Sequence, residues 1–312
     1  MDSKNLVTIA DLSVREINEL FALTAQIKGS YKNRQTDHSL AGKTVGMIFE
    51  KSSMRTRVSF EVAMTQLGGH AIYLTKQDIN LGERESIKDV AAILSRYVDC
   101  VTIRTYAHET IVELANHSSV PVINALSDYT HPCQALTDLY TVKEKIGTLD
   151  GVKIAFIGDG NNNVVRSLAF LCAKLDVSVM IASPENYELP VESLELAVKS
   201  AKPSTCIEQK RNPMEVIKDA DIVYTDTWVS MGREAEAETR RNDFKTYQVN
   251  GQLMASAKQG AFVMHCLPAH RGEEITDEVI DGPRSIVYDQ AENRLHLQKA
   301  LLKFLICGKE KE

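Results

Sequence analysis

The sequence has no long apolar run. Among its 312 residues there is no stretch of about eighteen consecutive apolar side chains, the length that a membrane-spanning helix requires. The first residues, MDSKNLVTIADLS, are polar and lack the apolar core and cleavage pattern of a signal peptide. We therefore expect a cytoplasmic protein, and its length favours two domains.

Excess positive charge is also absent. Lys and Arg number 36 against 42 Asp and Glu, which gives a formal net charge of −6. Proteins that bind nucleic acids or membrane surfaces use a cationic excess to attract the polyanion. The balance argues against both classes, so any site for a small anion has to be a local cluster of basic residues.

Paired cysteines are missing as well. The six cysteines are widely separated, with no CxxC pair and no spacing typical of zinc ligands. This pattern is typical of reduced thiols in a cytoplasmic enzyme. We expect neither disulfides nor a metal.

Nucleotide-binding motifs are incomplete. There is no GxxxxGK phosphate loop, and the turn DGNNN gives Gly158-x-Gly160-x-x-Asn163, which lacks the third glycine of a dinucleotide fingerprint. Ser183 stands where an acidic residue would contact the ribose. The sequence therefore predicts no cofactor, with a nicotinamide-dependent dehydrogenase as a distant alternative. Three asparagines at a helix start suit instead the charged ends of a zwitterion.

Strand-like apolar runs alternate with helical stripes along the chain. Ser13 and Glu16 form a capping box ahead of a first helix. The strand-like runs lie at 44–49, 71–74, 100–103 and 120–124, then in VKIAFIG at 152–158 and at 177–182, 220–225, 261–265 and 286–289. This alternation predicts an α/β protein with two doubly wound, mostly parallel sheets.

The pattern restarts near residues 149–151, which suggests a domain boundary. We place a first domain at 1–147 and a second at 148–290. The last stretch, a helix of about 291–312 that is apolar on one face, is expected to pack back on the first domain.

The first candidate site follows the strand at 44–49. Ser53, Arg55, Thr56 and Arg57 crowd the start of the next helix in EKSSMRTRVSF. A helix N-terminus offers unpaired N–H groups and a positive dipole end, and arginine adds a planar fork, so together they suit phosphate. The ordinary alternative is a solvated capping turn, but the position directly after a buried strand favours the anion site.

Further polar residues lie at helix starts and strand ends. His131 precedes Pro132 at a helix start, with Gln134 in the first turn, and both are uncharged donors suited to a carbonyl oxygen. Asp226 ends one strand and Cys266 follows another, at the sheet edge where α/β proteins bind ligands. Each has an ordinary alternative, namely a helix cap, a loop cap or a core thiol.

Together these segments resemble the transcarbamylase family. SMRTR at 53–57 resembles its carbamoyl phosphate motif, usually STRTR, and HPCQ at 131–134 resembles its HPxQ motif. The resemblance continues through DGNNN, SMG at 230–232, HCLP at 265–268 and AENR at 291–294, in the family's order over essentially the whole chain. The pair SMG and HCLP is typical of the branch that uses ornithine, and the aspartate branch carries neither.

The resemblance implies two α/β domains with the active site in the cleft between them. The first domain would hold carbamoyl phosphate and the second the amino acid. The side-chain amine of L-ornithine would attack the carbamoyl carbon and give L-citrulline and phosphate. The residues leave open whether the reaction serves arginine biosynthesis or runs in reverse in catabolism.

The resemblance also assigns roles to individual residues. Those expected to act in catalysis are Cys266, Asp226, Arg104 and His131. Those expected to bind carbamoyl phosphate are Ser53, Met54, Arg55, Thr56, Asn80, Arg104, His131, Gln134, Cys266, Leu267 and Arg294. Those expected to bind ornithine are Asn162, Asp226, Ser230 and Met231. Either Asp226 or Cys266 would take the proton of the amine.

The family pattern further implies a homotrimer in which a loop of one subunit reaches the neighbouring site. Asn80 lies in that loop, where many relatives carry Gln, and Met54 replaces the usual Thr of the phosphate motif, where its backbone N–H would make the contact. The charged stretch from Met231 to about Val249 is expected to be exposed, and 231–241 to close over the acceptor and exclude water.

Two other functions are open on the same residues. One is a sibling transferase whose acceptor is putrescine or N-acetylornithine. The other is a non-catalytic amino-acid or phosphate sensor built on the same fold.

Overall fold

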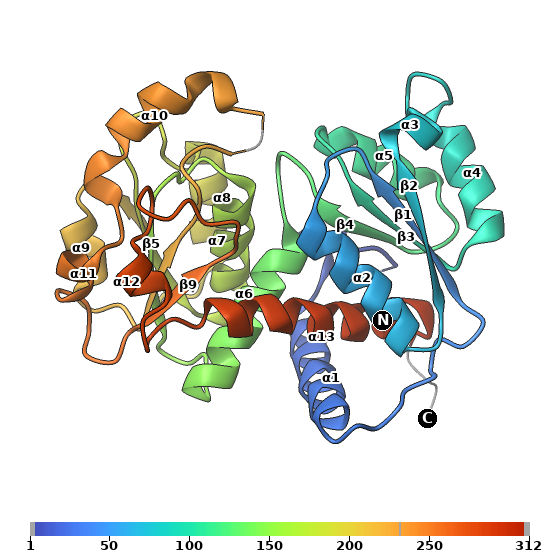
Figure 1. Ribbon diagram of the computed structural model, residues 1–312, viewed down its shortest axis with the longest axis horizontal. Helices are drawn as coiled ribbons and strands as arrows, with labels where there is room; N and C mark the ends of the chain where they lie inside the picture. Colours follow the sequence, from blue (N-terminus) through green and yellow to red (C-terminus); the bar gives the residue numbers. More distant parts are fainter. Residues whose placement is uncertain (1–3, 231, 309–312) are drawn as a thin grey trace. The chain divides into compact units, whose positions relative to one another are not determined.

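The protein divides into two compact units in a computed structural model that describes residues 4–230 and 232–308 (Figure 1). The first unit runs to Thr137 and takes up the chain again from Glu292, and the second comprises Asp138–Ala291. Both boundaries fall inside helices, α6 (Pro132–Ile146) and α13 (Val287–Ile306). We expected the boundary between residues 147 and 148, just after α6 ends, whereas the two units divide within α6, after Thr137.

The first unit is built on a parallel four-stranded sheet in the order β2-β1-β3-β4. Its strands are β1 (Thr44–Phe49), β2 (His70–Thr75), β3 (Cys100–Arg104) and β4 (Val122–Leu126). Its helices are α1 (Val14–Lys32), α2 (Met54–Gln66), α3 (Lys76–Ile79), α4 (Ile87–Tyr97) and α5 (His108–His117), a 3-10 turn at Ile9–Asp11, and the adjoining parts of α6 and α13.

The strand order of this sheet reverses between β1 and β3, because β2 lies on one side of β1 and β3 on the other. Phe49 at the end of β1 is in register with Arg104 at the end of β3. Open α/β sheets bind ligands at such switch points, outside the carboxyl ends of the strands. The first unit therefore presents one favoured ligand position, beyond Phe49 and Arg104.

The second unit holds a parallel five-stranded sheet in the order β7-β6-β5-β8-β9. Its strands are β5 (Lys153–Ile157), β6 (Ser178–Ala182), β7 (Ile207–Lys210), β8 (Ile222–Thr225) and β9 (Phe262–His265). Its helices are α7 (Asn163–Leu175), α8 (Val191–Ser200), α9 (Pro213–Ile217), α10 (Ala237–Asp243), α11 (Gly251–Met254) and α12 (Asp277–Ile280), with 3-10 turns at Glu234–Glu236 and Lys245–Tyr247. Here the switch point lies between β5 and β8.

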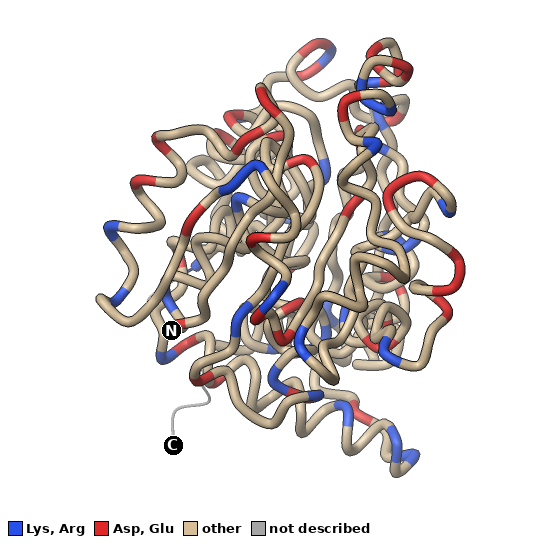
Figure 2. The backbone as a smooth tube through the Cα atoms, turned by 90° about the vertical axis from the view of Figure 1, so that its left-hand side faces the viewer, with Lys and Arg blue, Asp and Glu red and all other residues tan. Residues whose placement is uncertain are grey.

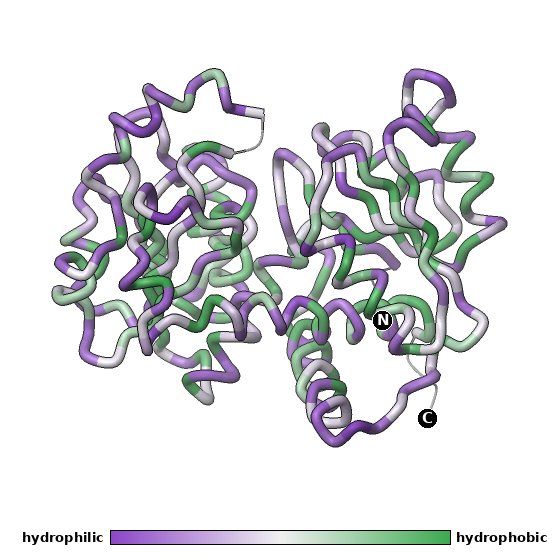
Figure 3. The backbone as a smooth tube through the Cα atoms, viewed as in Figure 1, coloured by the Kyte–Doolittle hydropathy of each residue, from purple (hydrophilic) through white to green (hydrophobic). Residues whose placement is uncertain are grey.

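The two doubly wound parallel sheets confirm the predicted α/β class. Hydrophobic residues recur along much of the two sheets (Figure 3). In β1 and β3, for example, every residue from Val45 to Phe49 and from Cys100 to Arg104 is buried. Acidic and basic residues are spread along the chain instead (Figure 2). None of the helices in the described ranges is long and apolar enough to cross a membrane.

The strand predicted at 286–289 is wrong. Val287 begins helix α13, and the preceding residues touch β9 through a single bridge between Ser285 and Val263. Ile286 and Val287 are both buried, so the apolar side chains that suggested a strand belong to the buried start of this helix. Short apolar runs do not distinguish a strand from the first turn of a buried helix.

The charged stretch after Met231 is mostly exposed, as expected, but three of its side chains anchor it. It forms a 3-10 turn and helix α10, and Arg240, Phe244 and Tyr247 are buried within the second unit. Phe244 packs against Trp228, with 5.9 Å between ring centroids. Met231 itself lies outside the described residues.

Candidate active site

The junction between β1 and α2 is built to expose backbone N–H groups. Ser53 is the N-cap of α2, with extended backbone angles, and its Oγ accepts a hydrogen bond from the Thr56 N–H at 3.2 Å. Met54 begins the helix and is 70% exposed, so its side chain takes no part in the core. The helix therefore starts directly beyond the switch point of the first sheet, with its positive dipole end towards it.

Three guanidinium groups gather at this switch point. Arg104, the last residue of β3, is 5% exposed, and its surroundings include Arg55 and Arg294. Burial, and then the like charges of Arg294 and Arg55, lower the pKa of the Arg104 guanidinium to about 10. No carboxylate is among the groups that act on Arg104, and its Nε has no hydrogen-bond partner among the described residues. Such a cluster is stabilised by an anion with several oxygens.

Helix α13 brings Arg294 to this cluster. Its Nη2 donates to Thr56 Oγ1 at 2.7 Å and its Nη1 donates to Gln134 Oε1 at 3.0 Å. All three side chains are buried, with 5% of Arg294 exposed. These bonds tie together three segments far apart in the sequence, and they hold the Gln134 carboxamide with its oxygen towards the arginine.

His131 lies beside the same arginines. It is 4% exposed, directly before α6, and burial followed by the charges of Arg294 and Arg104 holds the pKa of its imidazole well below the usual value. The ring is therefore neutral at physiological pH and donates through one N–H. Arg57, in contrast, pairs with Glu61 at 2.9 Å and lies over the Tyr73 ring, so it serves the surface of α2.

Asn80 is not brought to this cluster within the chain. It caps the short helix α3 in a left-handed conformation with φ of 48°, and Gly82 and Arg84 follow in a turn. The remaining residues expected around carbamoyl phosphate in the first unit, Ser53 to Thr56, Arg104, His131, Gln134 and Arg294, lie near the β1–β3 switch point or are linked to it by the contacts above.

The second unit has its own polar cluster at the β5–β8 switch point. Asn162 is the N-cap of α7, where its Oδ1 accepts from the Val165 N–H at 2.9 Å. Its Nδ2 donates to the Asp159 carbonyl at 2.9 Å and lies 3.5 Å from Asp226 Oδ2. Asp226 follows β8, so a carboxylate and a carboxamide meet where the strand order reverses.

Gly160 in the same turn has a structural explanation. A Cβ at this position would lie 2.6 Å from Ser183 Oγ and 3.0 Å from the Leu189 nitrogen and the Tyr187 oxygen. The chain's own 187–189 segment therefore fills the place where a dinucleotide pyrophosphate approaches a glycine-rich turn. This packing argues against the dehydrogenase alternative.

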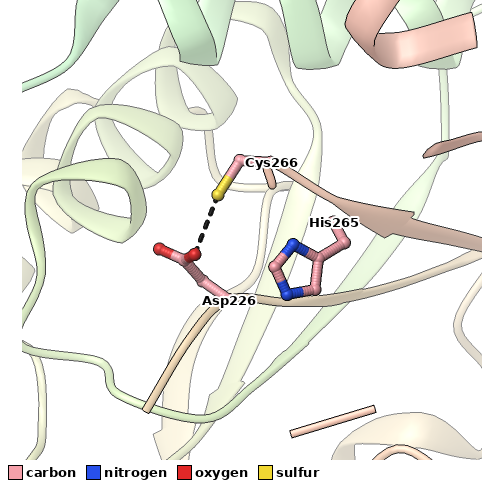
Figure 4. A group of neighbouring side chains, drawn as sticks. All are labelled: Asp226, His265 and Cys266. Carbon is pink, nitrogen blue, oxygen red and sulfur yellow. Dashed lines mark hydrogen bonds between the residues drawn. The ribbon is translucent and has the colours of Figure 1, made fainter. Parts of the chain in front are cut away.

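Cys266 completes this cluster. Its thiol follows β9 and donates to Asp226 Oδ1 at 2.9 Å, as Figure 4 shows. The side chain is half-buried, and desolvation followed by the Asp226 charge raises the pKa of the thiol well above its usual value. Cys266 is thus a protonated hydrogen-bond donor at neutral pH, with Asp226 as acceptor.

A buried His–Glu pair, which sequence reasoning missed, supports the turn after Cys266. His265 Nδ1 accepts from the Leu267 N–H at 2.8 Å, which leaves its Nε2 protonated and donating to Glu274 Oε1 at 3.0 Å. Glu274 is fully buried and also accepts from the His270 N–H at 2.6 Å. Leu267 adopts a left-handed φ of 58°, so these bonds fix a strained residue beside the thiol.

The atoms of Asp226, His265 and Cys266 lie within 4.8 Å of one another, close enough to ligate one metal ion. Both ring nitrogens of His265, however, already take part in the hydrogen bonds described above. Ser230 lies in the loop after β8, where its carbonyl accepts from the Arg233 N–H at 3.0 Å. Met231 was expected beside it and lies outside the described residues.

Comparison with known proteins agrees with this architecture. Residues 4–144 match the family model "Aspartate/ornithine carbamoyltransferase, carbamoyl-P binding domain", and residues 150–305 match "Aspartate/ornithine carbamoyltransferase, Asp/Orn binding domain". The chain is 50% identical to an ornithine carbamoyltransferase of Halalkalibacterium halodurans over 99% of this chain and 97% of the relative. It is 51% identical to one of Bacillus subtilis over 97% and 94%.

Solved structures show the same likeness. The structure of ornithine carbamoyltransferase from Pyrococcus furiosus superimposes with a TM-score of 0.95 at 49% identity, covering 98% of each chain. The two family matches, the relatives of nearly equal length and the shared fold all point to one family. The chain belongs to the aspartate/ornithine carbamoyltransferase family.

Proposed function

We propose that the protein transfers the carbamoyl group of carbamoyl phosphate to the side-chain amine of L-ornithine, giving L-citrulline and phosphate. The observation that carries this proposal is the gathering of Arg104, Arg55 and Arg294 at the switch point of the first sheet, where burial and the charges of the other two arginines lower the pKa of Arg104 to about 10. Its support from outside the chain is that the relatives compared above are named ornithine carbamoyltransferases.

The first unit's cluster binds the donor. The N–H groups at the start of α2, with the side chains of Ser53, Arg55 and Arg104, hold the phosphate. Thr56, Arg104 and neutral His131 donate to the carbamoyl oxygen, which gains negative charge in the tetrahedral transition state. Preorganised donors of this kind are typically worth about 10²–10³ in rate each.

The second unit's cluster binds the acceptor. Asn162, Asp226, Ser230 and Met231 hold the charged ends of ornithine and orient its side chain. Its amine, with an unperturbed pKa of about 10.4, has to lose a proton before it attacks. Because the Cys266 thiol is held protonated, Asp226 is the better candidate to receive that proton, and Cys266 acts as a donor to Asp226.

The remaining roles concern the carbamoyl group. It is contacted by Arg294 of the first unit and by Cys266 and the Leu267 carbonyl of the second. In a homotrimer, Asn80 reaches the phosphate of a neighbouring subunit. The 231–241 segment then covers the acceptor, and the reaction proceeds in the cytoplasm without a cofactor.

A colorimetric assay of the carbamoylated product tests the proposal. With carbamoyl phosphate and equal concentrations of L-ornithine, putrescine, N-acetylornithine or L-aspartate, we expect rapid product formation from ornithine alone. The Arg55→Ala variant serves as the control, and calorimetry should show that it no longer binds carbamoyl phosphate. Faster turnover of putrescine or N-acetylornithine would identify a sibling transferase, and binding without product would identify a sensor.

A further inference from the structure

A polar groove lies in the first unit, lined by residues other than those of the candidate site. It has a volume of about 1200 Å³ and is formed by the second half of α1, the residues that follow it, the end of α2 and the middle of α13. None of the residues assigned to substrates above lines it. A groove of this size accommodates a small organic molecule.

The lining of this groove is basic in a protein of net negative charge. Lys32, Arg34, Lys299 and Lys303 all line it, together with a single acidic residue, Asp37. That carboxylate is already engaged, since it accepts from the Ser39 N–H at 2.8 Å and lies 3.6 Å from Lys303 Nζ. One carboxylate therefore faces four cations.

Lys299 is the most unusual of these cations. The residue is 3% exposed, and its Nζ lies 4.8 Å from the centroid of the Tyr31 ring. No carboxylate among the described residues lies within ion-pair distance of it. A buried ammonium normally has such a partner, because its desolvation is costly. Lys299 also lies before the last turn of α13, so the helix dipole does not account for it.

Gln66 adds an uncharged group to the same lining. It ends helix α2, and its Oε1 is buried without a hydrogen-bond donor among the described residues. A carboxamide offers two donors on its other side. Because the oxygen is the buried end of this carboxamide, the Nε2 end is the one that can donate to an acceptor in the groove.

Arg34 stands at a backbone position that favours glycine. It has φ of 56° directly after the C-cap of α1, and the Gln35 N–H bonds to the Ser30 carbonyl at 3.0 Å while the Arg34 N–H bonds to Tyr31. This pair of bonds is the Schellman motif, in which the left-handed residue is usually glycine because a Cβ is strained there. A cationic side chain thus lines the groove at a strained position.

We propose that this groove is a binding site for a small polyanion, an organic molecule with two or more phosphate or carboxylate groups. Lys299, Arg34 and Lys303 supply the charge and Gln66 an uncharged donor. The helices that form it also carry candidate-site residues, because α2 begins near Thr56 and α13 contains Arg294, which are bonded at 2.7 Å.

Titration calorimetry with two probes tests this site. Pyrophosphate represents phosphate ligands and citrate represents carboxylate ligands, and the titrations use the full chain with Arg55→Ala, so that the candidate active site does not contribute. We expect one equivalent of at least one probe to bind per chain. Lys299→Met and Arg34→Gly, each added to that background, should weaken binding by at least tenfold.

The variants are chosen so that misfolding is not mistaken for lost binding. Glycine suits the left-handed conformation of residue 34, so Arg34→Gly should melt at the same temperature as the parent or higher while losing affinity. Lys210→Met, which removes a half-exposed lysine on β7 that pairs with Glu208, should bind the probe as the parent does.

Three outcomes would overturn the proposal. One is the absence of binding heat from either probe. Another is unchanged affinity in both Lys299→Met and Arg34→Gly. The third is a change of oligomeric state in Lys299→Met, seen by sedimentation, in a protein that binds neither probe, since the groove would then be a contact between copies of the chain.

Discussion

At the scale of single residues, the Cys266 thiol defines the chemistry of the acceptor cluster. Burial and the Asp226 carboxylate raise the pKa of this thiol, so that it stays protonated and donates to Asp226 at 2.9 Å. A protonated thiol is neither a nucleophile nor a base. Its useful property is the hydrogen bond, which orients the carboxylate and stabilises its charge.

Two substitutions separate a donor role from a thiolate role. Serine retains an O–H donor in nearly the same place, so Cys266→Ser should keep turnover within about tenfold of the parent. Cys266→Ala leaves Asp226 without this donor and should lower turnover by about 10²–10³. Steady-state kinetics at several pH values would measure both, with carbamoyl phosphate affinity nearly unchanged in each variant.

Equal loss in the serine and alanine variants would show that the thiolate itself acts. A parallel loss of carbamoyl phosphate binding would instead place Cys266 in the donor site alone. The first result would assign the proton-accepting role to the thiol, which is one of the two roles that the sequence left open.

Most residues of the two clusters were predictable from sequence because each lies at a strand end or a helix start, where local pattern fixes position. Glu274 was not. It lies in the charged stretch HRGEEIT, which is typical of an exposed turn, and only the folded chain reveals that it is buried against His265. Arg294 and Thr56 are far apart in sequence, so only the family resemblance assigned both to carbamoyl phosphate, and their hydrogen bond was not predicted.

At the scale of elements, helix α10 shows how a charged segment is anchored. Arg240 Nη1 donates to Asp159 Oδ2 and to the Trp228 carbonyl, each at 2.8 Å, with both side chains of the ion pair at most 5% exposed. Burial raises the pKa of the Asp159 carboxyl even though Arg240 lies beside it. Burial alone would lower the pKa of the Arg240 guanidinium, but the carboxylates of Asp159 and Glu236 outweigh it and raise that pKa. The attraction is therefore strong, and the desolvation of the carboxylate is costly.

Breaking this pair should destabilise the second unit. Arg240→Met leaves Asp159 buried without its cation, and removal of one partner of a buried pair typically costs about 3–5 kcal/mol. The neighbouring Arg241→Ala is the matched control, because its pair with Glu273 is exposed and worth under about 1 kcal/mol. Urea unfolding followed by the fluorescence of Trp228, the chain's one tryptophan, would measure both. Similar midpoints for the two variants would contradict a structural role for the buried pair.

Helices and strands were predicted correctly where a short stretch of sequence carries a strong pattern. The Ser13 capping box and the strand Thr44–Phe49 are present as expected, because a cap and a fully buried strand each have a strong pattern. Strand β7, with the sequence IEQK and only Ile207 fully buried, gave no apolar signal and was missed. The helix start at Val287 was mistaken for a strand, since its burial depends on tertiary packing.

At the scale of the whole molecule, the proposed trimer makes each active site a joint product of two chains. The loop that holds Asn80 in a left-handed conformation contacts no other candidate-site residue through the hydrogen bonds described above. If that loop contributes Asn80 to a neighbouring subunit's site, each site combines Arg55 of one subunit with Asn80 of another.

Mixing two inactive proteins tests this arrangement. Asn80→Gly removes the carboxamide without straining the left-handed backbone, and we expect it to lower activity at least tenfold, as Arg55→Ala should. Subunits of the two variants, dissociated together and reassembled, should regain a fraction of the parent activity, because some sites combine an intact Arg55 with a neighbour's intact Asn80. Activity that stays at the level of the separate variants would place the loop's function within its own subunit.

The division of the chain at α6 and α13 also bears on biosynthesis. A nascent polypeptide that has emerged as far as Ala291 contains every residue of the second unit. The first unit at that moment still lacks Asn293, whose Oδ1 accepts from the buried Lys28 Nζ at 2.6 Å, and Arg294. The half that is translated first is thus completed last, because its fold waits for residues that follow the whole of the second unit.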